Sequence, residues 1–280
     1  MHAEFSAPGV EIADGLGSPL SAALAERDRD TLQMVRGALD RKQVMLAFQP
    51  IVRADAPDRA AFYEGLIRVL DETGRIIPAR DFINTIENNE MGRIVDCLSL
   101  ELGLRALADD PGLRLSINMS ARSVGYQRWM HTLNQGLALD TTVGERLILE
   151  ITESSAMLMP ELVISFMADL QQRGIAFALD DFGAGYTAFR FLKDFFFDVI
   201  KIDGQFIRGI AANTDNQVLT RALISIAGHF DMFTVAESVE NADDAEFLTE
   251  IGIDCLQGYY YGAPTITAPA GLEALARARA

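Results

Sequence analysis

Short apolar runs that end in a polar residue recur along the chain, and this pattern is its most informative feature. Short runs rich in Val, Ile, Leu and Phe are typical of buried β-strands. The pattern predicts strands at residues 45–48, 61–63, 115–117, 147–149, 176–179, 199–200, 233–236 and 253–256. The polar residues at their ends are Gln49, Glu64, Asn118, Glu150, Asp180, Lys201, Glu237 and Gln257.

Segments long enough for a helix, such as 161–173 and 216–230, separate most of these strands. Apolar strands that alternate with helices form a parallel sheet, and eight such units close into a barrel. The predicted fold is therefore α/β, a modified (β/α)8 TIM-like barrel. Reactive groups in such barrels lie at the carboxyl ends of the strands, where these polar residues fall.

The first interval between strands departs from this pattern. Only 14 residues separate Gln49 from Glu64, and a parallel crossover needs a dozen or more residues beyond the strands themselves. A hairpin with its turn near Pro57 fits this spacing. The first strand is then antiparallel to the second, with Gln49 roughly opposite Glu64 at the same mouth of the barrel.

The whole chain divides into three parts. Residues 1 to about 26 are rich in Gly, Ala, Ser and Pro, and a short helix over 28–40 carries Leu32, Val35 and Leu39 on one face. Residues 41–265 lack a long Pro/Gly/Ser linker and form one predicted domain. Residues 266–280 are a tail. We therefore expect a leader with a short helix (1–40), the domain and the tail.

Composition narrows the possible partners and the compartment. The formal charge of −16 disfavours non-specific attraction to DNA or to anionic membranes. No apolar stretch approaches 18 residues, and the N-terminus has no export signal, so we expect no membrane segment. Cys97 and Cys255 lie far apart in apolar surroundings, as in a reducing compartment. These features predict a cytoplasmic protein.

The strand-end residues form a set that points to metal chemistry. Five of them are carboxylates, counting Asp181 beside Asp180, and their mutual repulsion on one rim is relieved by bound cations. Oxygen ligands without clustered His or Cys favour Mg²⁺ or Mn²⁺, and five carboxylates suit two ions. Such a pair activates water for phosphoryl transfer. Lys201 would hold the attacking water or stabilise charge on the phosphate oxygens.

Each of these acids has an ordinary alternative. A single Glu or Asp at a strand end is more often a salt-bridged or capping residue, and Asp180-Asp181 before Phe-Gly-Ala-Gly also fits a plain strand exit with a glycine turn. Joint placement at nearly every strand end favours a functional set. The run at 195–197 (Phe-Phe-Phe) is core material first, and an exposed part would suit a dimer contact.

Eight motifs, in order along residues 41–265, resemble the signatures of the EAL family. Any one of them is weak evidence, but the ordered set is specific. The matches are Q-P-I at 49–51, E-A-L-x-R at 64–68, N-x-S at 118–120, E-x-T-E at 150–153, D-D-F-G-T-G-Y at 180–186, K-I-D at 201–203, E-G-V-E at 237–240 and Q-G-Y at 257–259. The chain is thus similar to EAL domains.

This resemblance implies hydrolysis of cyclic di-GMP to linear pGpG with two Mg²⁺ or Mn²⁺ ions, in a barrel with an antiparallel first strand. It assigns Lys201 to the attacking water, Glu240 to the surroundings of the second metal, and Glu153 to anchoring the loop after Asp181, which takes part in dimerisation. The implied metal ligands are Glu64, Asn118, Glu150, Asp180, Asp181 and Glu237. The implied nucleotide contacts are Gln49, Leu66, Arg68 and Gln257, with Arg68 on a phosphate.

Three positions depart from the family's pattern. Gly65 stands for Ala, Ala184 for Thr and Ser238 for Gly. Ser238 matters most, because a glycine there would serve a backbone conformation that a Cβ disturbs. None of the three removes a charged site residue, so we expect an active enzyme and a homodimer. The rival hypotheses are a catalytically weak receptor that binds cyclic di-GMP and signals through its surface, and a scaffold without nucleotide or metal.

Overall fold

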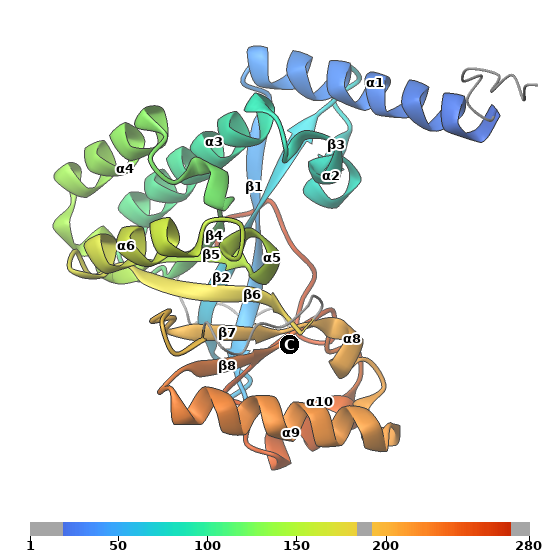
Figure 1. Ribbon diagram of the computed structural model, residues 1–280, viewed down its shortest axis with the longest axis vertical. Helices are drawn as coiled ribbons and strands as arrows, with labels where there is room; N and C mark the ends of the chain where they lie inside the picture. Colours follow the sequence, from blue (N-terminus) through green and yellow to red (C-terminus); the bar gives the residue numbers. More distant parts are fainter. Residues whose placement is uncertain (1–18, 184–191, 270–280) are drawn as a thin grey trace, which may run out of the picture.

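Eight strands close into a barrel in the computed structural model, which describes residues 19–183 and 192–269 (Figure 1). Their order around the barrel is β1-β9-β8-β7-β6-β5-β4-β2, and β2 pairs back with β1. The bounds are β1 Val44–Arg53, β2 Ala60–Leu70, β4 Leu115–Asn118, β5 Leu147–Thr152, β6 Ala176–Phe182, β7 Val199–Ile202, β8 Phe233–Ala236 and β9 Cys255–Gln257. All eight predicted strands are confirmed.

The hairpin at the start of the barrel is confirmed as well. Strand β1 is antiparallel to both β2 and β9, and the remaining neighbours are parallel. Gln49 is directly opposite Glu64 in the register. Both strands continue beyond the mouth of the barrel, where the short strand β3 (Ile76–Pro78), which the sequence pattern did not predict, pairs with β2.

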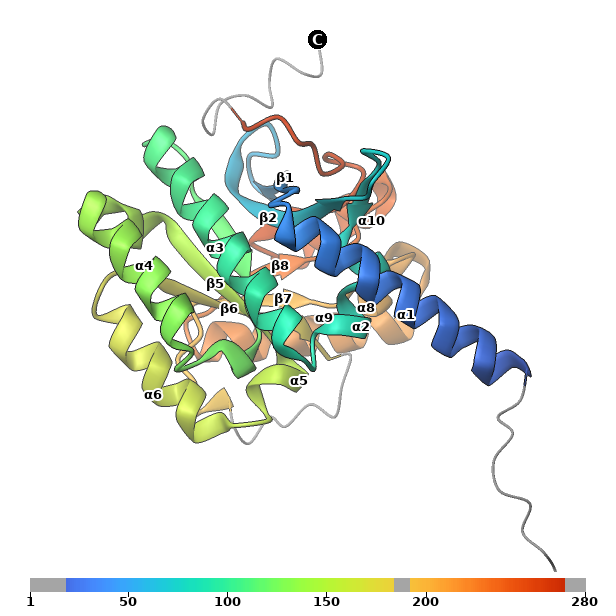
Figure 2. The same ribbon diagram turned by 90° about the horizontal axis from the view of Figure 1, so that it is seen from above.

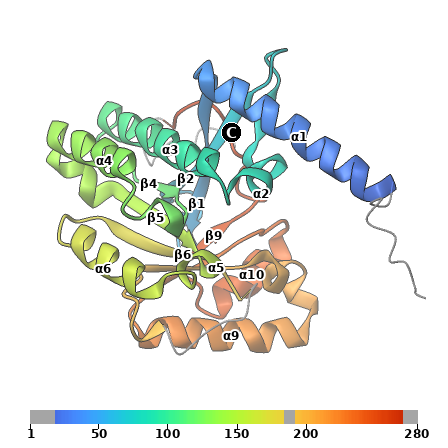
Figure 3. The same ribbon diagram turned by 45° about the horizontal axis from the view of Figure 1, so that its top comes forward.

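Helices cover the outside of the barrel. Figures 1 and 3 show α3, α4 and α6 on one side and α9 and α10 on the opposite side. Asn89, Asn213 and Asn241 cap the helices α3, α9 and α10 by accepting hydrogen bonds from backbone N–H groups. The helix bounds are α1 Pro19–Asp40, α2 Ile83–Ile86, α3 Glu90–Asp109, α4 Gln127–Leu139, α5 Glu153–Ala156, α6 Pro160–Gln171, α8 Gly204–Ile207, α9 Thr214–His229 and α10 Ala242–Glu250. Short 3₁₀ helices lie at Ala79–Asp81, Ala121–Ser123, Thr141–Arg146 and Ile210–Ala212.

The N-terminal helix α1 is longer than the sequence pattern predicted. It begins at Pro19 rather than at Asp28, because the Leu, Ala and Glu residues of 19–26 favour helix. The first part of α1 extends away from the barrel (Figure 2). Its last turns pack against the barrel and bury Val35, Ala38 and Leu39. The predicted tail beyond residue 269 and the leader before residue 19 lie outside the described residues.

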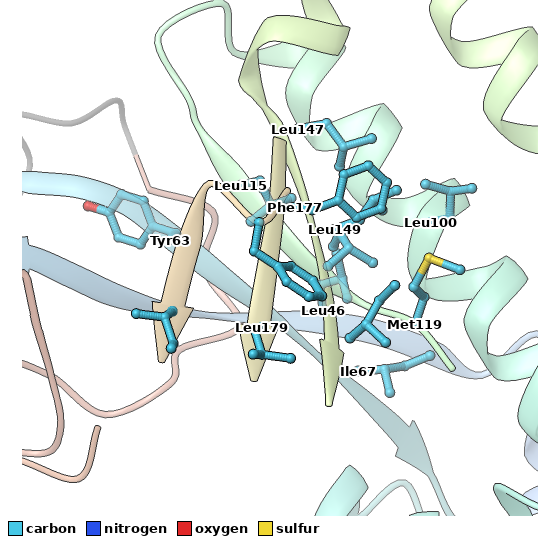
Figure 4. Close-up of a cluster of buried hydrophobic side chains, with 14 of the residues drawn as sticks. Leu46, Tyr63, Ile67, Leu100, Leu115, Met119, Leu147, Leu149, Phe177 and Leu179 are labelled. Carbon is cyan, nitrogen blue, oxygen red and sulfur yellow. The ribbon is translucent and has the colours of Figure 1, made fainter. Parts of the chain in front are cut away.

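Two apolar clusters lie on the two faces of the barrel wall. The larger one fills the space between the strands and the helices, where Leu115 and Leu149 face α3 and Phe177 packs against Phe166 of α6 (Figure 4). Because side chains alternate along a strand, their neighbours point into the barrel. The smaller cluster lies in the barrel's interior and consists of Ile51, Phe62, Ala178, Val199, Val235 and Cys255. In the described part of the chain, no helix is long and apolar enough to cross a membrane.

Candidate functional site

Lys201 lies at the centre of the carboxyl end of the barrel and contacts four carboxylates. Its Nζ is 2.8 Å from Glu150, 2.8 Å from Glu237, 2.9 Å from Asp180 and 3.4 Å from Glu64. Its side chain is 1% exposed. The strands β2, β5, β6 and β7 and the end of β8 bring these residues together, as the barrel prediction required.

Amide side chains from three further strands complete the inner ring around Glu64. Asn118 Nδ2 donates to Glu64 Oε1 at 2.8 Å, and Gln257 Nε2 donates to Glu64 Oε2 at 2.6 Å. Gln257 also donates to Gln49 Oε1 at 3.3 Å, and Gln49 Nε2 donates to the carbonyl of Gly262. These bonds hold Glu64 in one orientation. Because Asn118 uses its Nδ2 for this contact, its Oδ1 can serve as a ligand for another partner.

Three carboxylates form a second grouping on the other side of Lys201. Asp180, Asp181 and Glu237 each place one oxygen within 4.8 Å of the others. Asp181 has a left-handed backbone, with φ at 54°, a conformation that Asp tolerates better than most residues. This turn at the end of β6 lets two consecutive acids face the same site, which an extended strand would not allow.

The site concentrates more negative charge than one lysine neutralises. Burial, and then the charge of Glu64, raises the pKa of Glu150 to about 8. Burial, and then Asp180, raises the pKa of Asp181 to about 6. Burial also raises the pKa of Glu237 well above its usual value, although Lys201 opposes the shift. Burial would lower the pKa of Lys201, but the carboxylates around it outweigh burial and raise it.

These residues fit a pair of hard divalent cations. Glu150 Oε1 is buried and has no hydrogen-bond partner among the described residues, an uncommon and costly state for a carboxylate oxygen. The pKa values of Glu150, Asp181 and Glu237 are raised first by burial, and the neighbouring carboxylates add to the rise because they outnumber their cation. The donor set of Glu64, Asn118, Glu150, Asp180, Asp181 and Glu237 consists of oxygens alone, which suits Mg²⁺ or Mn²⁺.

Glu153 lies at the start of α5 and contacts the exit of β6. Its Oε2 accepts a hydrogen bond from the backbone N–H of Gly183 at 3.2 Å, and its side chain is buried. Glu153 therefore fixes the first residue after the Asp180-Asp181-Phe182 strand end. The rest of the predicted loop, with the departure at Ala184, lies outside the described residues.

The predicted nucleotide contacts continue along β2 beyond Glu64. Leu66 and Arg68 lie on the same face of the strand as Glu64 because side chains alternate. The guanidinium of Arg68 donates to the carbonyl of Ile67, and burial, together with nearby Arg80, lowers its pKa. The sequence analysis did not identify Arg80, which donates to the hydroxyl of Tyr259 at 3.3 Å. Nothing in its local pattern distinguishes it from a surface arginine.

Glu240 lies apart from the buried carboxylates. It is 54% exposed and pairs with Arg208 at 3.7 Å rather than with Lys201. Arg208 Nη2 also donates to Ser238 Oγ at 2.9 Å, so one arginine connects the residues on both sides of Val239. Arg208, which directly follows α8, is a second residue that the sequence analysis missed, since only the fold brings it to this loop.

Ser238, the departure that mattered most, has the backbone conformation that favours glycine. Its φ is 56°, in the left-handed region. The chain accommodates the serine through its neighbours. Gly204 leaves the space that Ser238 fills, since a Cβ on Gly204 would lie 2.7 Å from the Cβ of Ser238. The hydrogen bond from Arg208 then holds the serine in place.

Gly65, the departure beside Glu64, also has a structural explanation. A Cβ at this position would lie 2.7 Å from Cδ1 of Ile117 on the neighbouring strand. Ile117 therefore occupies the volume in which an alanine methyl group would lie. The substitution changes packing behind the sheet and leaves Glu64 in its ring of partners.

Asp96 on α3 supports the site from outside the barrel and was also missed. Its Oδ2 accepts hydrogen bonds from the backbone N–H of Ser120 at 3.0 Å and from the hydroxyl of Ser123 at 2.6 Å. Burial raises the pKa of Asp96 to about 6 despite these bonds. The contacts fix the turn that follows Asn118 at the end of β4.

Comparison with known proteins places the chain in a family. Residues 32–264 match the model of the EAL domain. The chain is 31% identical over 239 residues to the cyclic di-GMP phosphodiesterase PdeF of Escherichia coli K12, with 83% of this chain and 31% of PdeF covered. It is 32% identical over 241 residues to the cyclic di-GMP phosphodiesterase PdeR of the same organism, with 82% and 35% covered. The chain spans about a third of the length of these curated relatives.

Solved structures share the fold. The structure of the PaMucR phosphodiesterase in complex with c-di-GMP superimposes with a TM-score of 0.76 at 27% identity, with 84% of this chain and 97% of that chain covered. The EAL domain of Xanthomonas citri FimX, also in complex with c-diGMP, gives a TM-score of 0.79 at 22% identity, with 90% and 99% covered, and shows the fold alone. The family model matches most of the length of this chain, and the chain forms a barrel of the same architecture. This chain is therefore a member of the EAL domain family.

Proposed function

We propose that the chain is a metal-dependent phosphodiesterase that hydrolyses cyclic di-GMP to linear pGpG. The observation that carries the proposal is the buried ring around Lys201, in which four carboxylates contact one ammonium group and Glu150 Oε1 has no hydrogen-bond or ion-pair partner among the described residues. A buried cluster with more carboxylates than cations is stabilised by further positive charge. The phosphodiesterases that the chain resembles, PdeF and PdeR, act on cyclic di-GMP.

In the proposed mechanism, six residues hold two Mg²⁺ or Mn²⁺ ions: Glu64, Asn118, Glu150, Asp180, Asp181 and Glu237. Bound there, the ions would lower the pKa of water and stabilise charge on the phosphate oxygens. The amides of Asn118 and Gln257 keep Glu64 oriented. Lys201 orients the attacking water and offsets the charge of the carboxylates around it. Water adds across one phosphodiester bond, and the ring opens to a linear dinucleotide with a terminal phosphate.

Substrate contacts are proposed for the residues around this ring. Arg68 holds a phosphate through its planar guanidinium, and Arg80 adds a second positive charge on the same side. Gln49 and Gln257 offer amide groups to the nucleotide, and Leu66 offers an apolar surface. Glu240 reaches the second metal or its waters only if it leaves Arg208.

One assay tests the enzyme hypothesis and separates it from the receptor and the scaffold. The protein is incubated with cyclic di-GMP and Mn²⁺, and pGpG is measured with and without EDTA, beside calorimetric binding in Ca²⁺. We expect pGpG that EDTA abolishes. Binding without product would support the receptor, and neither binding nor product would support the scaffold. Glu150→Gln should abolish turnover, whereas the exposed control Glu161→Gln should not.

The homodimer and the location in the cytoplasm remain predictions. Phe195 and Phe197 are buried, whereas Phe196 is 71% exposed, so one of the three phenylalanines is available for a contact. The hydrogen bond from the backbone N–H of Gly183 to Glu153 supports the proposed role of Glu153 as a loop anchor. Light scattering on an active sample at high concentration would contradict the dimer if it gave a monomer mass.

A further inference from the structure

A cavity of about 570 Å³ lies inside the barrel at the end opposite Lys201. TIM-type barrels usually fill their interior with layers of large side chains. Here two small residues of β2, Ala60 and Ala61, lie next to the layer beneath the site, and the space remains open. The apolar wall of the cavity is formed by Phe62, Ile148, Val199, Val235, Ile253 and Cys255.

The cavity shares its wall with the floor of the candidate site. Val199 and Val235 precede Lys201 and Glu237 by two positions on the same strands, and residues two apart in a strand point to the same face. The same spacing holds for three further pairs of cavity and site residues. These pairs are Phe62 with Glu64, Ile148 with Glu150 and Cys255 with Gln257. One layer of side chains therefore separates the cavity from the charged ring.

A β-bulge opens this end of the barrel. Ile51 pairs with Phe62 and Val52 pairs with Ala60, so Ala61 is an extra residue in β2. The bulge lets two consecutive residues, Ala61 and Phe62, line the cavity. Because Ala61 carries only a methyl group, the bulge adds volume rather than filling it.

Charged groups surround the mouth of the cavity, and one cation among them is unpaired. Arg53 forms two short contacts with Asp55, at 2.6 and 2.7 Å, so these two charges neutralise each other. Asp254 accepts hydrogen bonds from the N–H and the hydroxyl of Thr234. The guanidinium of Arg114 has no ion-pair or hydrogen-bond partner among the described residues.

We propose that this cavity binds a small molecule that has one carboxylate group and an apolar remainder, and that the bound molecule regulates the candidate site around Lys201. The apolar body lies against the wall of the cavity, and the carboxylate pairs with Arg114. The volume falls in the range of natural small-molecule pockets, which combine an apolar lining with few polar groups. The occupant touches Val199 and Val235, so it shifts the strands that carry Lys201 and Glu237. This regulatory part rests on the proposed function, whereas binding does not.

Calorimetry with decanoate and decylamine tests the binding part. The two probes have chains of the same length and opposite charges, and both are used below their micellar concentrations. We expect one decanoate per chain, with decylamine at least about ten-fold weaker, since a charge-assisted hydrogen bond contributes about one such factor. The proposal would be overturned if decanoate did not bind, or if decylamine bound as tightly as decanoate.

Two variants locate the probe. Arg114→Gln should weaken decanoate about ten-fold, whereas the matched change of an exposed arginine on α3, Arg105→Gln, should leave it unchanged. Ala61→Leu fills part of the cavity and should abolish binding, with thermal unfolding as the check on its fold. If decanoate bound both Arg114→Gln and Ala61→Leu as tightly as the unmodified chain, it would lie elsewhere and the site would be refuted.

Turnover of cyclic di-GMP with saturating decanoate tests the regulatory part. We expect a change of at least about two-fold in kcat, consistent with the sensitivity of catalysis to small displacements, and no change in Ala61→Leu. Binding with unchanged turnover would overturn the regulatory part. A chain without phosphodiesterase activity would contradict the proposed function instead, and the calorimetric result would be unaffected.

Discussion

The interior of the barrel has an upper half, at the carboxyl ends of the parallel strands, and a lower half, at their amino ends. The two halves differ in chemistry although the same strands form both. The upper half contains buried ionisable groups, with Lys201 among four carboxylates. Two residues earlier on the same strands, the lower half contains apolar side chains such as Val199 and Val235. Side-chain alternation assigns both positions to the interior, so the strand geometry alone does not determine which half is polar.

This difference shows how the fold separates stability from chemistry. Val235 and its neighbours keep water away from Lys201 from below, and charges interact more strongly where water is excluded. The same exclusion raises the pKa of Glu150. The upper half is costly on its own, because it buries more negative than positive charge. We therefore expect substitutions in the upper half to alter metal binding and rate, and substitutions in the lower half, with the cavity unoccupied, to alter mainly stability.

The largest expected loss of rate at nearly unchanged substrate affinity follows from replacing Lys201. Lys201→Met retains much of the side chain's volume and removes the charge, and we expect kcat to fall by about two decades or more, on the scale of losing an acid–base or charge-stabilising group. Affinity for cyclic di-GMP should change far less, because Arg68 and the metal ligands remain. The measurements are steady-state formation of pGpG and calorimetric binding in Ca²⁺.

Glu64→Ala is the matched comparison for Lys201. It removes a proposed metal ligand and the acceptor of two amide hydrogen bonds, so both rate and binding should weaken. A Lys201→Met protein with near-normal kcat would refute the role of Lys201 in orienting water. Activation of the water would then rest on the metals alone.

The second prediction concerns pH and the metal-free protein. Glu150 has a pKa of about 8 when folded against an ordinary value of 4.5, so the folded chain binds more protons than the unfolded chain between these values. The free energy of unfolding in EDTA should therefore fall as the pH rises through this window, by at least about 1 kcal/mol between about pH 5 and about pH 8.5. Urea unfolding at several pH values measures this fall.

Metal should reverse this dependence, because it binds the deprotonated carboxylates. With Mn²⁺ present, stability should rise or stay level over the same pH range. Glu150→Gln should reduce the fall seen in EDTA, and the exposed control Glu161→Gln should not. A metal-free chain whose stability increased with pH across this window would contradict the assignment of Glu150 as a buried, under-neutralised carboxylate.

The third prediction concerns the loop that carries Glu237 and Glu240. Ser238→Gly relieves a left-handed backbone but loses the hydrogen bond from Arg208, so its stability should change by less than about 1 kcal/mol. Arg208→Ala releases both Ser238 and Glu240 without relieving the backbone. We expect Arg208→Ala to lower kcat by about three- to ten-fold and Ser238→Gly by less, through displacement of the loop. Arg105→Ala is the control, and equal kcat in all proteins would refute a positioning role for Arg208.

The sequence predicted the barrel because each strand carries its own signal. An apolar run with a polar end occurs in all eight strands, and the short interval before Glu64 left a hairpin as the simplest connection. The length of α1 and the short strand β3 were not predicted. Strand β3 has three residues and forms only because β2 extends past the barrel to pair with it, so its own sequence carries little information.

The inner ring of the site was predicted for the same reason, since strand ends meet wherever a barrel closes. Lys201, Glu150 and Glu64 meet as expected. Arg208 and Asp96 were not found, because each reaches the site from a helix whose position depends on the packing of the whole domain. The cavity below the ring was also not predicted, since an empty volume leaves no pattern in the residues around it.

The smallest expected effect on rate comes from the lower half of the interior. Val235→Ala removes two methyl groups from a fully buried position between the cavity and the site, and it should lower the free energy of unfolding by about 1–2 kcal/mol. Val95 on α3 is also buried but lies outside the barrel. Val95→Ala is therefore the control, and it should lower the free energy of unfolding by a similar amount. We expect kcat to change less than about two-fold in both, because neither variant touches a charged group. A loss of rate in Val235→Ala as large as in Arg208→Ala would show that the lower layer positions Glu237 as well as supporting it, and the division of the interior into a stabilising and a reacting half would fail.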